Sequence, residues 1–520
     1  MPRTPSLASE NEALRAQNAE LQGQLACLQQ QLDWLKRQVF GRKSERVESD
    51  VPPGQGVLPF EGLAPVAEAQ EPEQETVVRK RRKHRSDNCL TDSGLRFTSD
   101  VPQRQITILP ESVRNLPADA YEIIDYRTHY RLAQQPASYE VIAYRHASVK
   151  LLDSQEMITT APCPAVLDRC CAEVSLLAGM IVDKFAYHLP LYRQHQRIQA
   201  AGITVSRASL TNWVRCALAL LAPIVDAQKA NILRSKVLAM DETPIKAGRD
   251  KKGSMKQGWF WPMYGEDGEI VFCYAPDRGH ASAQKLLGHY AGTLLSDGHS
   301  AYEHFCADNP AATHAQCWAH TRRYFERALD DEPEAASAAL DIIRDIFAQE
   351  TEIRERDLTP EKILAWRQKH SEPLVRDFFA FCHEQRQRMD LAPKSPFAKA
   401  LGYASHPQRI DALKVFLGDS AVATDTNHLE RALRPIPMGR KNWLFCWNEL
   451  GAEHVGIAQS LVSTCRIQGI DPYTYLVDVL QRIDQHPARL VEELTPRLWK
   501  QHFADNPLRS DLADAVLITE

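Results

Sequence analysis

Three acidic residues that lie far apart in the sequence occur in patterns suited to metal-ion chemistry. Asp241 follows the apolar run 237–240, Asp297 follows the run 292–296, and Glu430 lies within the segment 425–435. Carboxylate oxygens are hard ligands that suit Mg²⁺, which keeps several waters and takes one or two carboxylates from a protein. Each aspartate also has an ordinary explanation, because Asp commonly caps a strand or opens a turn, as in Asp297-Gly298. The chemistry therefore depends on whether the fold brings the three acids together.

The strand expected before Asp241 predicts which acid faces a shared site. Residues 237–244 read as a buried strand that ends at Pro244. Side chains alternate between the two faces of a strand, so Asp241 shares a face with Val237 and Ala239 while Glu242 points the other way. This alternation excludes Glu242 from a site that contains Asp241.

The elements after Asp241 have an informative order. Strands are expected at 258–264 and 269–274, a helix near 281–290, and a fourth strand at 292–296 that ends at Asp297. Three strands, a helix and a strand ending in an acid resemble the front half of a ribonuclease-H-like α/β core. In that core the first and fourth strands lie side by side, so Asp241 and Asp297 would be neighbours able to share divalent metal ions.

The third acid lies on a short helix that begins at a capping residue and ends at Pro435. Helical spacing places Asn427, Glu430, Arg431 and Arg434 on one side, and the apolar residues 429, 432 and 433 on the side that packs on the sheet. Two simpler explanations of Glu430 remain open. It could form an exposed ion pair with Arg434, or a capping box with Asn427.

The N-terminal region 1–46 predicts a coiled coil. Leucines recur every seven residues at positions 7, 14, 21, 28 and 35, and Asn11 and Asn18 share a core register with Leu25. A buried Asn at such a position favours two parallel strands, so we expect a dimer. The alternative is a single amphipathic helix folded back on the rest of the chain.

A linker at 47–86 follows, and it separates acidic from basic charge. The whole chain has 62 Lys and Arg against 67 Asp and Glu, a net charge of −5, but residues 51–78 contain five Glu and no basic residue. The linker ends in a basic cluster suited to phosphate contact: Arg79, Lys80, Arg81, Arg82, Lys83 and Arg85. A solvated charge run explains the cluster equally well.

A small β-rich domain is expected at 87–171 and a helical region at 172–232. Within the latter, two helical segments flank Ala201-Gly202 and suggest a helix-turn-helix, with Ser206 capping the second helix. Arg207 and Asn212 would then lie on its exposed first turns, where a recognition helix contacts DNA. Many helical hairpins bind nothing, so the shape alone does not establish DNA contact.

Several motifs together are more specific than any one of them. They are Asp-Glu-Thr-Pro at 241–244, Ser-Asp-Gly at 296–298, Cys-Trp-Ala-His at 317–320 followed by Arg322-Arg323, and Glu-Arg-Ala-Leu-Arg-Pro at 430–435 with Gly-Arg-Lys-Asn-Trp at 439–443. In this order they resemble the DDE transposases of the insertion-sequence-66 family, and the likeness extends to the leucine heptads.

The resemblance implies a magnesium-dependent DNA transposase whose catalytic and metal-binding acids are Asp241, Asp297 and Glu430. Two Mg²⁺ ions are implied, with Mn²⁺ as a substitute. The residues it suggests for DNA contact are His320, Arg322, Arg323, Asn427, Arg431, Arg434, Arg440 and Lys441. The core would occupy 233–330 and 417–480, with a helical insertion at 331–416 and a C-terminal tail at 481–520. The implied partners are the transposon ends, target DNA, a second copy of the chain and small accessory proteins of the same element.

The chain departs from the family at the zinc-binding domain. Many members have paired CxxC motifs after the coiled coil, whereas this chain has none, so zinc is not expected. The cysteines are scattered singly, apart from the neighbours Cys170 and Cys171, and no apolar segment reaches ~20 residues. These features indicate a cytoplasmic protein without a membrane span. Two other classes stay open: a structure-selective nuclease on the same core, and a catalytically inactive dimeric DNA-binding protein.

Overall fold

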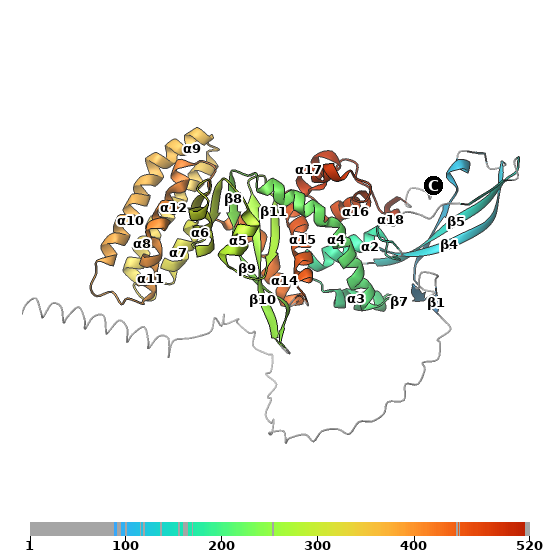
Figure 1. Ribbon diagram of the computed structural model, residues 1–520, viewed down its shortest axis with the longest axis horizontal. Helices are drawn as coiled ribbons and strands as arrows, with labels where there is room; N and C mark the ends of the chain where they lie inside the picture. Colours follow the sequence, from blue (N-terminus) through green and yellow to red (C-terminus); the bar gives the residue numbers. More distant parts are fainter. Residues whose placement is uncertain are drawn as a thin grey trace, which may run out of the picture. The chain divides into compact units, whose positions relative to one another are not determined.

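The computed structural model of the chain divides into residues Met1–Asp87 and Asn88–Glu520. It describes residues 88–514, with gaps at 91–94, 99–100, 115, 118–119, 136–137, 154–155, 160–164, 169, 252–253, 444–445 and 447. The predicted coiled coil, the linker and the basic cluster at 79–85 lie outside the described residues. The described part is a mixed α/β structure (Figure 1).

A mixed sheet occupies the middle of the described chain. Its strands are β8 (Val237–Met240), β9 (Thr243–Lys251), β10 (Ser254–Gly265), β11 (Ile270–Ala275), β12 (Thr293–Ser296) and β13 (Thr313–Gln316). The order is β11-β10-β8-β12-β13, and β9 pairs with β10. The first strand and the strand before Asp297 are therefore neighbours, as predicted: β8 and β12 pair in parallel.

The predicted single strand at 237–244 is wrong in one respect. It breaks after Met240 into β8 and β9. Alternation does hold within β8, because Leu238 and Met240 join one hydrophobic cluster while Val237 and Ala239 join another. Asp241 and Glu242 lie in the connection between the two strands, so the alternation rule does not extend to them.

Helices cover both faces of this sheet. On one face, α5 (His280–Leu287) and α6 (Ser300–Asp308) contribute Leu287 and Phe305 to the cluster that contains Leu238 and Met240. On the other, α15 (Glu449–Ile467) packs on β11. Gly456 permits this approach, since a Cβ there would lie 2.3 Å from the carbonyl oxygen of Phe272.

The edge strand β11 is closed by polar side chains of α15. The Ser460 hydroxyl accepts the amide hydrogen of Phe272 at 2.9 Å, and Thr464 accepts that of Ile270 at 3.2 Å. An open strand edge invites pairing with another chain, so these bonds protect it.

The region predicted to be β-rich contains two sheets. One has the order β3-β5-β4, from β3 (Gln103–Ile108), β4 (Tyr121–Gln135) and β5 (Ser138–Leu151), with β6 (Met157–Thr159) paired to β5 and the 3₁₀ turn η1 (Glu111–Val113) between β3 and β4. The other joins β1 (Asn88–Leu90) and β2 (Arg96–Thr98) to β7 (Ile203–Thr204). β7 thus ties this region to the helices that follow.

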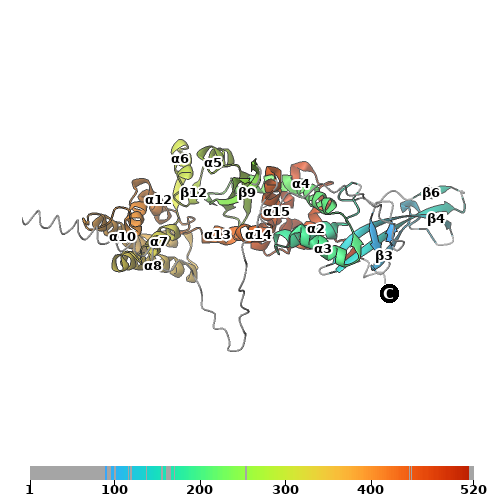
Figure 2. The same cartoon turned by 90° about the horizontal axis from the view of Figure 1, so that it is seen from below.

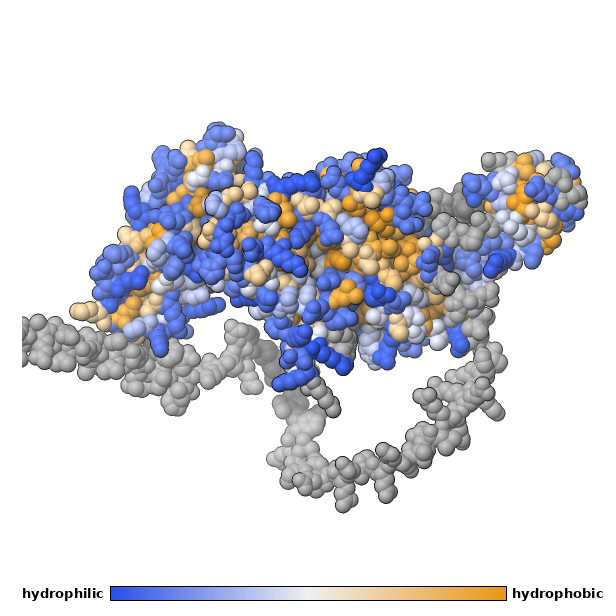
Figure 3. All heavy atoms as spheres, viewed as in Figure 1, coloured by the Kyte–Doolittle hydropathy of each residue, from blue (hydrophilic) through white to orange (hydrophobic). Residues whose placement is uncertain are grey.

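Those helices are α2 (Val174–Phe185), α3 (Leu191–Ala200) and α4 (Arg207–Ile232). The Ser206 cap is confirmed, because its hydroxyl accepts the amide hydrogen of Ser209 at 3.0 Å. The connection between α3 and α4 holds the strand β7 rather than a bare turn. In the described part of the chain, α4 alone is long and apolar enough to cross a membrane, but it packs against α15 and β11. Figure 3 shows apolar side chains gathered around α4 and hydrophilic ones over much of the viewed face.

A helical bundle follows α7 (Trp318–Glu326), in the region predicted as an insertion. It comprises α8 (Pro333–Glu355), α9 (Pro360–Trp366), the π-helical turn η2 (Arg367–Ser371), α10 (Glu372–Arg386), α11 (Pro396–Ala404) and α12 (Pro407–Gly418) (Figure 2). Buried Trp318 joins α7 to this bundle: its ring contacts Phe378, and its indole donates to the carbonyl of Leu413 at 2.9 Å. The bundle therefore fixes the start of α7.

The C-terminal region contains α13 (Asn427–Leu433), α14 (Pro435–Trp443), α16 (Pro472–Arg482), the 3₁₀ segment η3 (Ala488–Leu494), α17 (Pro496–His502) and α18 (Asp511–Asp514). The prediction of a tail from residue 481 is wrong for the described part. Trp499 is 2% exposed and donates to the buried Asp478, and Leu512 is buried against β5. This segment completes the core.

Candidate active site

The carboxyl ends of three strands meet at one edge of the central sheet. β10 runs antiparallel to both β8 and β11, and β12 runs parallel to β8, so β8, β11 and β12 share a direction. Residues that follow these strands must gather at the same edge. They are Asp241 after β8, Arg278 after β11 and Asp297 after β12.

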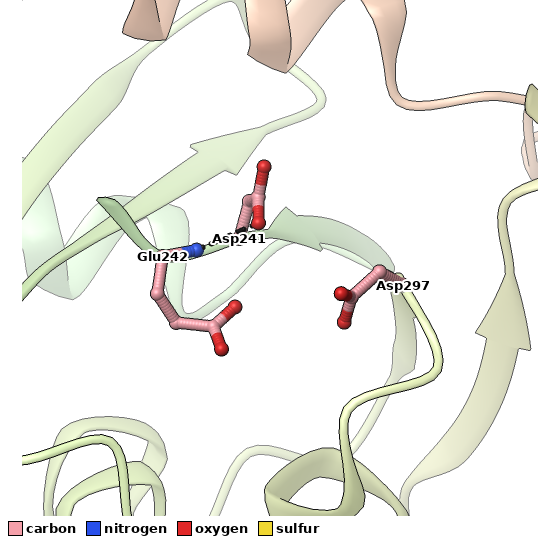
Figure 4. Close-up of side chains that lie close together, drawn as sticks. All are labelled: Asp241, Glu242 and Asp297. Carbon is pink, nitrogen blue, oxygen red and sulfur yellow. Dashed lines mark hydrogen bonds between the residues drawn. The ribbon is translucent and has the colours of Figure 1, made fainter. Parts of the chain in front are cut away.

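Asp241, Glu242 and Asp297 form one acidic cluster. Each offers a carboxylate oxygen, and these oxygens lie within 4.8 Å of one another. Figure 4 shows the Glu242 side chain extended toward Asp297, below Asp241. The expectation that Glu242 faces away from the site is wrong, because the chain leaves the strand conformation at Asp241.

Glu242 is held by three neighbours. Its side chain is 0% exposed and accepts hydrogen bonds from Arg278 Nε and, at 2.9 Å, from the Tyr302 hydroxyl. His299 Nδ1 lies 3.6 Å away. Burial is the main cause that raises the pKa of Glu242, and the Arg278 guanidinium opposes this rise.

Arg278 also connects Glu242 to Asp297. Its Nη2 lies 3.9 Å from Asp297 Oδ2, and its guanidinium stands over the Trp259 ring, 5.1 Å from the centroid. Asp297 Oδ1 accepts the amide hydrogen of His299 at 2.9 Å. Both acids are thus oriented before any ligand binds.

Burial and neighbouring negative charges disfavour the ionised form of Asp241. Burial and the Glu242 carboxylate, with smaller effects of Asp297 and Glu430, raise the pKa of Asp241 to about 8. Carboxylates crowded in a buried place favour the proton unless a cation neutralises them. The donor set of oxygens within 4.8 Å therefore fits a divalent cation.

Cation affinity should therefore depend on pH. With a pKa of about 8, Asp241 holds a proton below that pH and the cation must displace it. We expect the affinity for Mn²⁺ to rise about tenfold per pH unit from pH 6 and to level off above the pKa. Calorimetric titration of the protein with MnCl₂ at several pH values measures this. Asp241→Asn should flatten the dependence, and a wild-type affinity independent of pH would contradict the assignment.

Glu430 lies near the cluster but is not one of its members. The Arg323 guanidinium donates to both of its oxygens through Nη2, at 2.6 and 2.5 Å, and His320 Nε2 lies 3.9 Å away. The negative charge of Glu430 contributes to the raised pKa of Asp241. Burial lowers the pKa of His320, so the ring favours its neutral form.

A buried contact holds the two helices that carry these residues. Both the amide and the hydroxyl of Thr426 lie 3.3 Å from Cys317 Sγ, and the amide of Trp318 donates to the carbonyl of Thr424 at 2.9 Å. The amide of Cys317 in turn donates to the carbonyl of Ser296 at 3.0 Å. α7 and α13 are therefore fixed to the strand that ends at Asp297.

The residues predicted to contact DNA are distributed over several elements. His320, Arg322 and Arg323 lie on α7, and Arg322 pairs with Glu326 at 3.1 Å. Asn427 and Arg431 lie on α13, the helix of Glu430, and Arg434 caps its end. Arg440 and Lys441 lie on α14. Arg207 and Asn212 are exposed on the first turns of α4.

The amphipathic pattern predicted for α13 agrees with its burial. Leu429 is fully buried, Ala432 and Leu433 are half-buried against the core, and Asn427, Arg431 and Arg434 are exposed. Arg440 Nη1 donates to the carbonyl of Pro244. DNA contact by Arg440 stays a prediction.

Sequence reasoning missed the residues that surround Glu242: Arg278, His299 and Tyr302. Arg278 could have been found from topology, since it follows a strand parallel to the one before Asp241. No sequence signal identified Tyr302 or His299, whose positions depend on the packing of α6.

Family models match three stretches of the chain. The transposase IS66 family matches residues 169–454, the IS66 C-terminal element matches 460–497, and the model described as transposase C of IS166 homeodomain matches 27–92. These matches, with the acidic cluster at the sheet edge, define a DNA-processing enzyme of the transposase class. The chain belongs to the IS66 family of transposases.

Three uncharacterised proteins of Sinorhizobium fredii are similar to the chain. y4hP is 32% identical over 64% of this chain and 63% of its own length. y4jD is 28% identical over 89% of this chain and 93% of its own length, and y4qI is 29% identical over 62% of each. The chain thus spans less than two thirds of y4hP and y4qI, and nearly all of y4jD.

Proposed function

We propose that this chain is a DDE transposase with a ribonuclease-H-like core that cleaves and joins DNA at the ends of a bacterial insertion sequence. The observation that carries the proposal is the parallel pairing of β8 with β12, which brings Asp241 and Asp297 together at one sheet edge. Glu430 would complete the catalytic set from α13. Family membership supports this assignment.

The acids are suited to hold divalent cations, and Mg²⁺ is proposed. Asp241 and Asp297 supply hard oxygen donors, and Glu430 would add a third carboxylate after release from Arg323. Divalent cations bound there would provide an activated water and neutralise charge on the phosphodiester. Mn²⁺ has similar ligand preferences and should substitute.

The side chains of the protein orient the reaction. In cleavage, a water loses a proton as its oxygen bonds to phosphorus, the P–O3′ bond breaks, and the leaving 3′ oxygen takes a proton. In strand transfer, the freed 3′ hydroxyl replaces water: it loses its proton as its oxygen bonds to a phosphorus of target DNA, and the 3′ oxygen of the target leaves and takes a proton. Arg323, beside Glu430, and Arg322 and Arg431 are proposed to hold phosphates, because guanidinium groups bind them in two-point fashion.

The proposed partners are transposon-end and target DNA in the bacterial cytoplasm, where the protein would associate with the nucleoid. The helix α4 presents Arg207 and Asn212 to solvent and would contact DNA through its first turns. The basic cluster at 79–85, Asn427, Arg434, His320 and Lys441 would add contacts, and the heptads would form a dimer. Small accessory proteins of the same element are further proposed partners.

The test is a cleavage and strand-transfer assay in which the purified chain is incubated with MgCl₂ and each of three DNA substrates. It is carried out with and without the co-encoded accessory proteins. They are a duplex with the element end and its flank, a scrambled duplex, and a branched duplex. We expect a magnesium-dependent nick at the element end and its joining to target DNA. Cutting of the branched duplex without end preference would support the nuclease. Binding without cleavage in Mg²⁺ or Mn²⁺ would support the inactive DNA-binding protein.

A further inference from the structure

A cavity of about 320 Å³ opens beside Glu430, between α7, α8 and the start of α13. Its wall contains three arginines, two acids and three other residues: Arg322, Arg323, Arg344, Glu326, Asp425, Ala319, Phe347 and Asn427. Two links join it to the acids: Arg323 binds Glu430 directly, and Asn427 lies one helical turn before Glu430 on α13. A ligand in this cavity therefore lies against Arg323, the residue that binds Glu430.

The composition of the wall selects a kind of ligand. Three guanidinium groups suit a phosphate and the Phe347 ring suits a flat base. Asn427 donates its side-chain amide to Asp425, so its Oδ1 is the atom that can accept from the edge of a base. The volume is at the lower end of the range for cavities that hold small organic molecules, ~300–1,000 Å³. It has room for one nucleotide and not for a base pair within a duplex.

The ion pairs already present do not block such a ligand. Arg322 pairs with Glu326 and Arg344 with Asp341 and Asp345, and both arginine side chains are more than half exposed. The Asp425 carboxylate accepts two hydrogen bonds from Asn427: Oδ1 from the backbone amide at 3.0 Å and Oδ2 from the side-chain amide at 2.6 Å. Exposed ion pairs are weak, so a phosphate can replace the carboxylate partners.

We propose that this cavity binds one unpaired nucleotide of the DNA substrate, adjacent to the strand that is cut. The proposal rests on the proposed function, since it places the nucleotide beside Glu430. A base inside a duplex is stacked on both faces, so only an overhanging or flipped-out nucleotide can present its face to Phe347. Entry of its phosphate would also give Arg323 a partner other than Glu430.

The test measures binding in EDTA, so that it does not depend on catalysis. The full chain is titrated into a fluorescent blunt duplex and into the same duplex with a one-nucleotide overhang, and anisotropy gives the two affinities. We expect the overhang to bind about tenfold more tightly, on the order of one base stacked on an aromatic ring. Phe347→Leu should remove this difference, and Phe347→Tyr should keep it.

Controls separate the possible failures. Phe381→Leu changes a half-buried Phe of α10 that does not line the cavity, and it should leave the preference intact. Equal affinities of the wild type for both duplexes would overturn the cavity proposal while leaving the proposed function standing. Competition by free thymidine monophosphate at the concentration of the DNA would also overturn it, because the ligand would then be a free nucleotide. A chain that binds neither duplex would contradict the proposed function itself.

Discussion

Replacement of Asp297 by Asn should reduce DNA cleavage and strand transfer by about a thousandfold or more. Asn has the same shape and keeps an oxygen that can accept the amide hydrogen of His299, now bonded at 2.9 Å. The change therefore removes mainly the negative charge. Loss of one ligand charge from a metal-assisted phosphoryl transfer costs several kcal/mol of transition-state stabilisation, and each ~1.4 kcal/mol is tenfold in rate.

The measurement is single-turnover cleavage of element-end DNA at saturating protein and MgCl₂. Asp297→Asn should bind this DNA as the wild type does, which separates chemistry from binding. Asp377→Asn is the matched control, because Asp377 is 60% exposed on α10 and pairs only loosely with Arg376, at 3.6 Å. If Asp297→Asn cleaves DNA at the rate of the wild type, Asp297 is not a catalytic residue.

The placement of Asp241 and Asp297 could be predicted because it depends on strand order. Four buried residues in β8 and four in β12 form a short, fully buried pair, and parallel pairing forces the residues after them to one edge. Local sequence carries this information through apolar runs and turn residues. The amphipathic pattern of α13 was also predictable from local sequence, because polar and apolar residues recur there at helical spacing.

The position of Glu242 could not be predicted by the same rule. Alternation requires an extended strand, and the chain leaves the strand at Met240, two residues before Glu242. The partners of Glu242 come from the turn after β11 and from α6, between 36 and 60 residues away in the sequence. Such contacts depend on how α6 packs, which no local pattern encodes.

The sequence and the geometry point to different residues as the third carboxylate of the site. Sequence resemblance points to Glu430, whereas Glu242 is the residue whose oxygen lies within 4.8 Å of those of Asp241 and Asp297. Their surroundings differ. The Glu242 side chain is fully buried and accepts hydrogen bonds from Arg278 and Tyr302. The Glu430 side chain is 23% exposed and pairs with Arg323, whose side chain is 39% exposed.

These surroundings predict different effects of two isosteric changes. Glu430→Gln should reduce cleavage about a thousandfold, because it removes a charge from a side chain that can turn to the substrate. Glu242→Gln should reduce cleavage only about 10- to 100-fold, the usual range for a residue that orients the ligands of a site. In this view Glu242 positions Arg278 and, through it, Asp297.

Single-turnover cleavage over a range of MgCl₂ concentrations measures both variants, with thermal unfolding as a check that each is folded. Glu372→Gln, at an exposed site in the first turn of α10, should behave as the wild type. Added MgCl₂ should recover part of the activity of Glu242→Gln, because this variant keeps the proposed metal ligands and loses only part of their orientation. It should not recover Glu430→Gln. The opposite ranking, with Glu242→Gln inactive at every metal concentration and Glu430→Gln mild, would make Glu242 the third ligand and assign Glu430 to DNA contact.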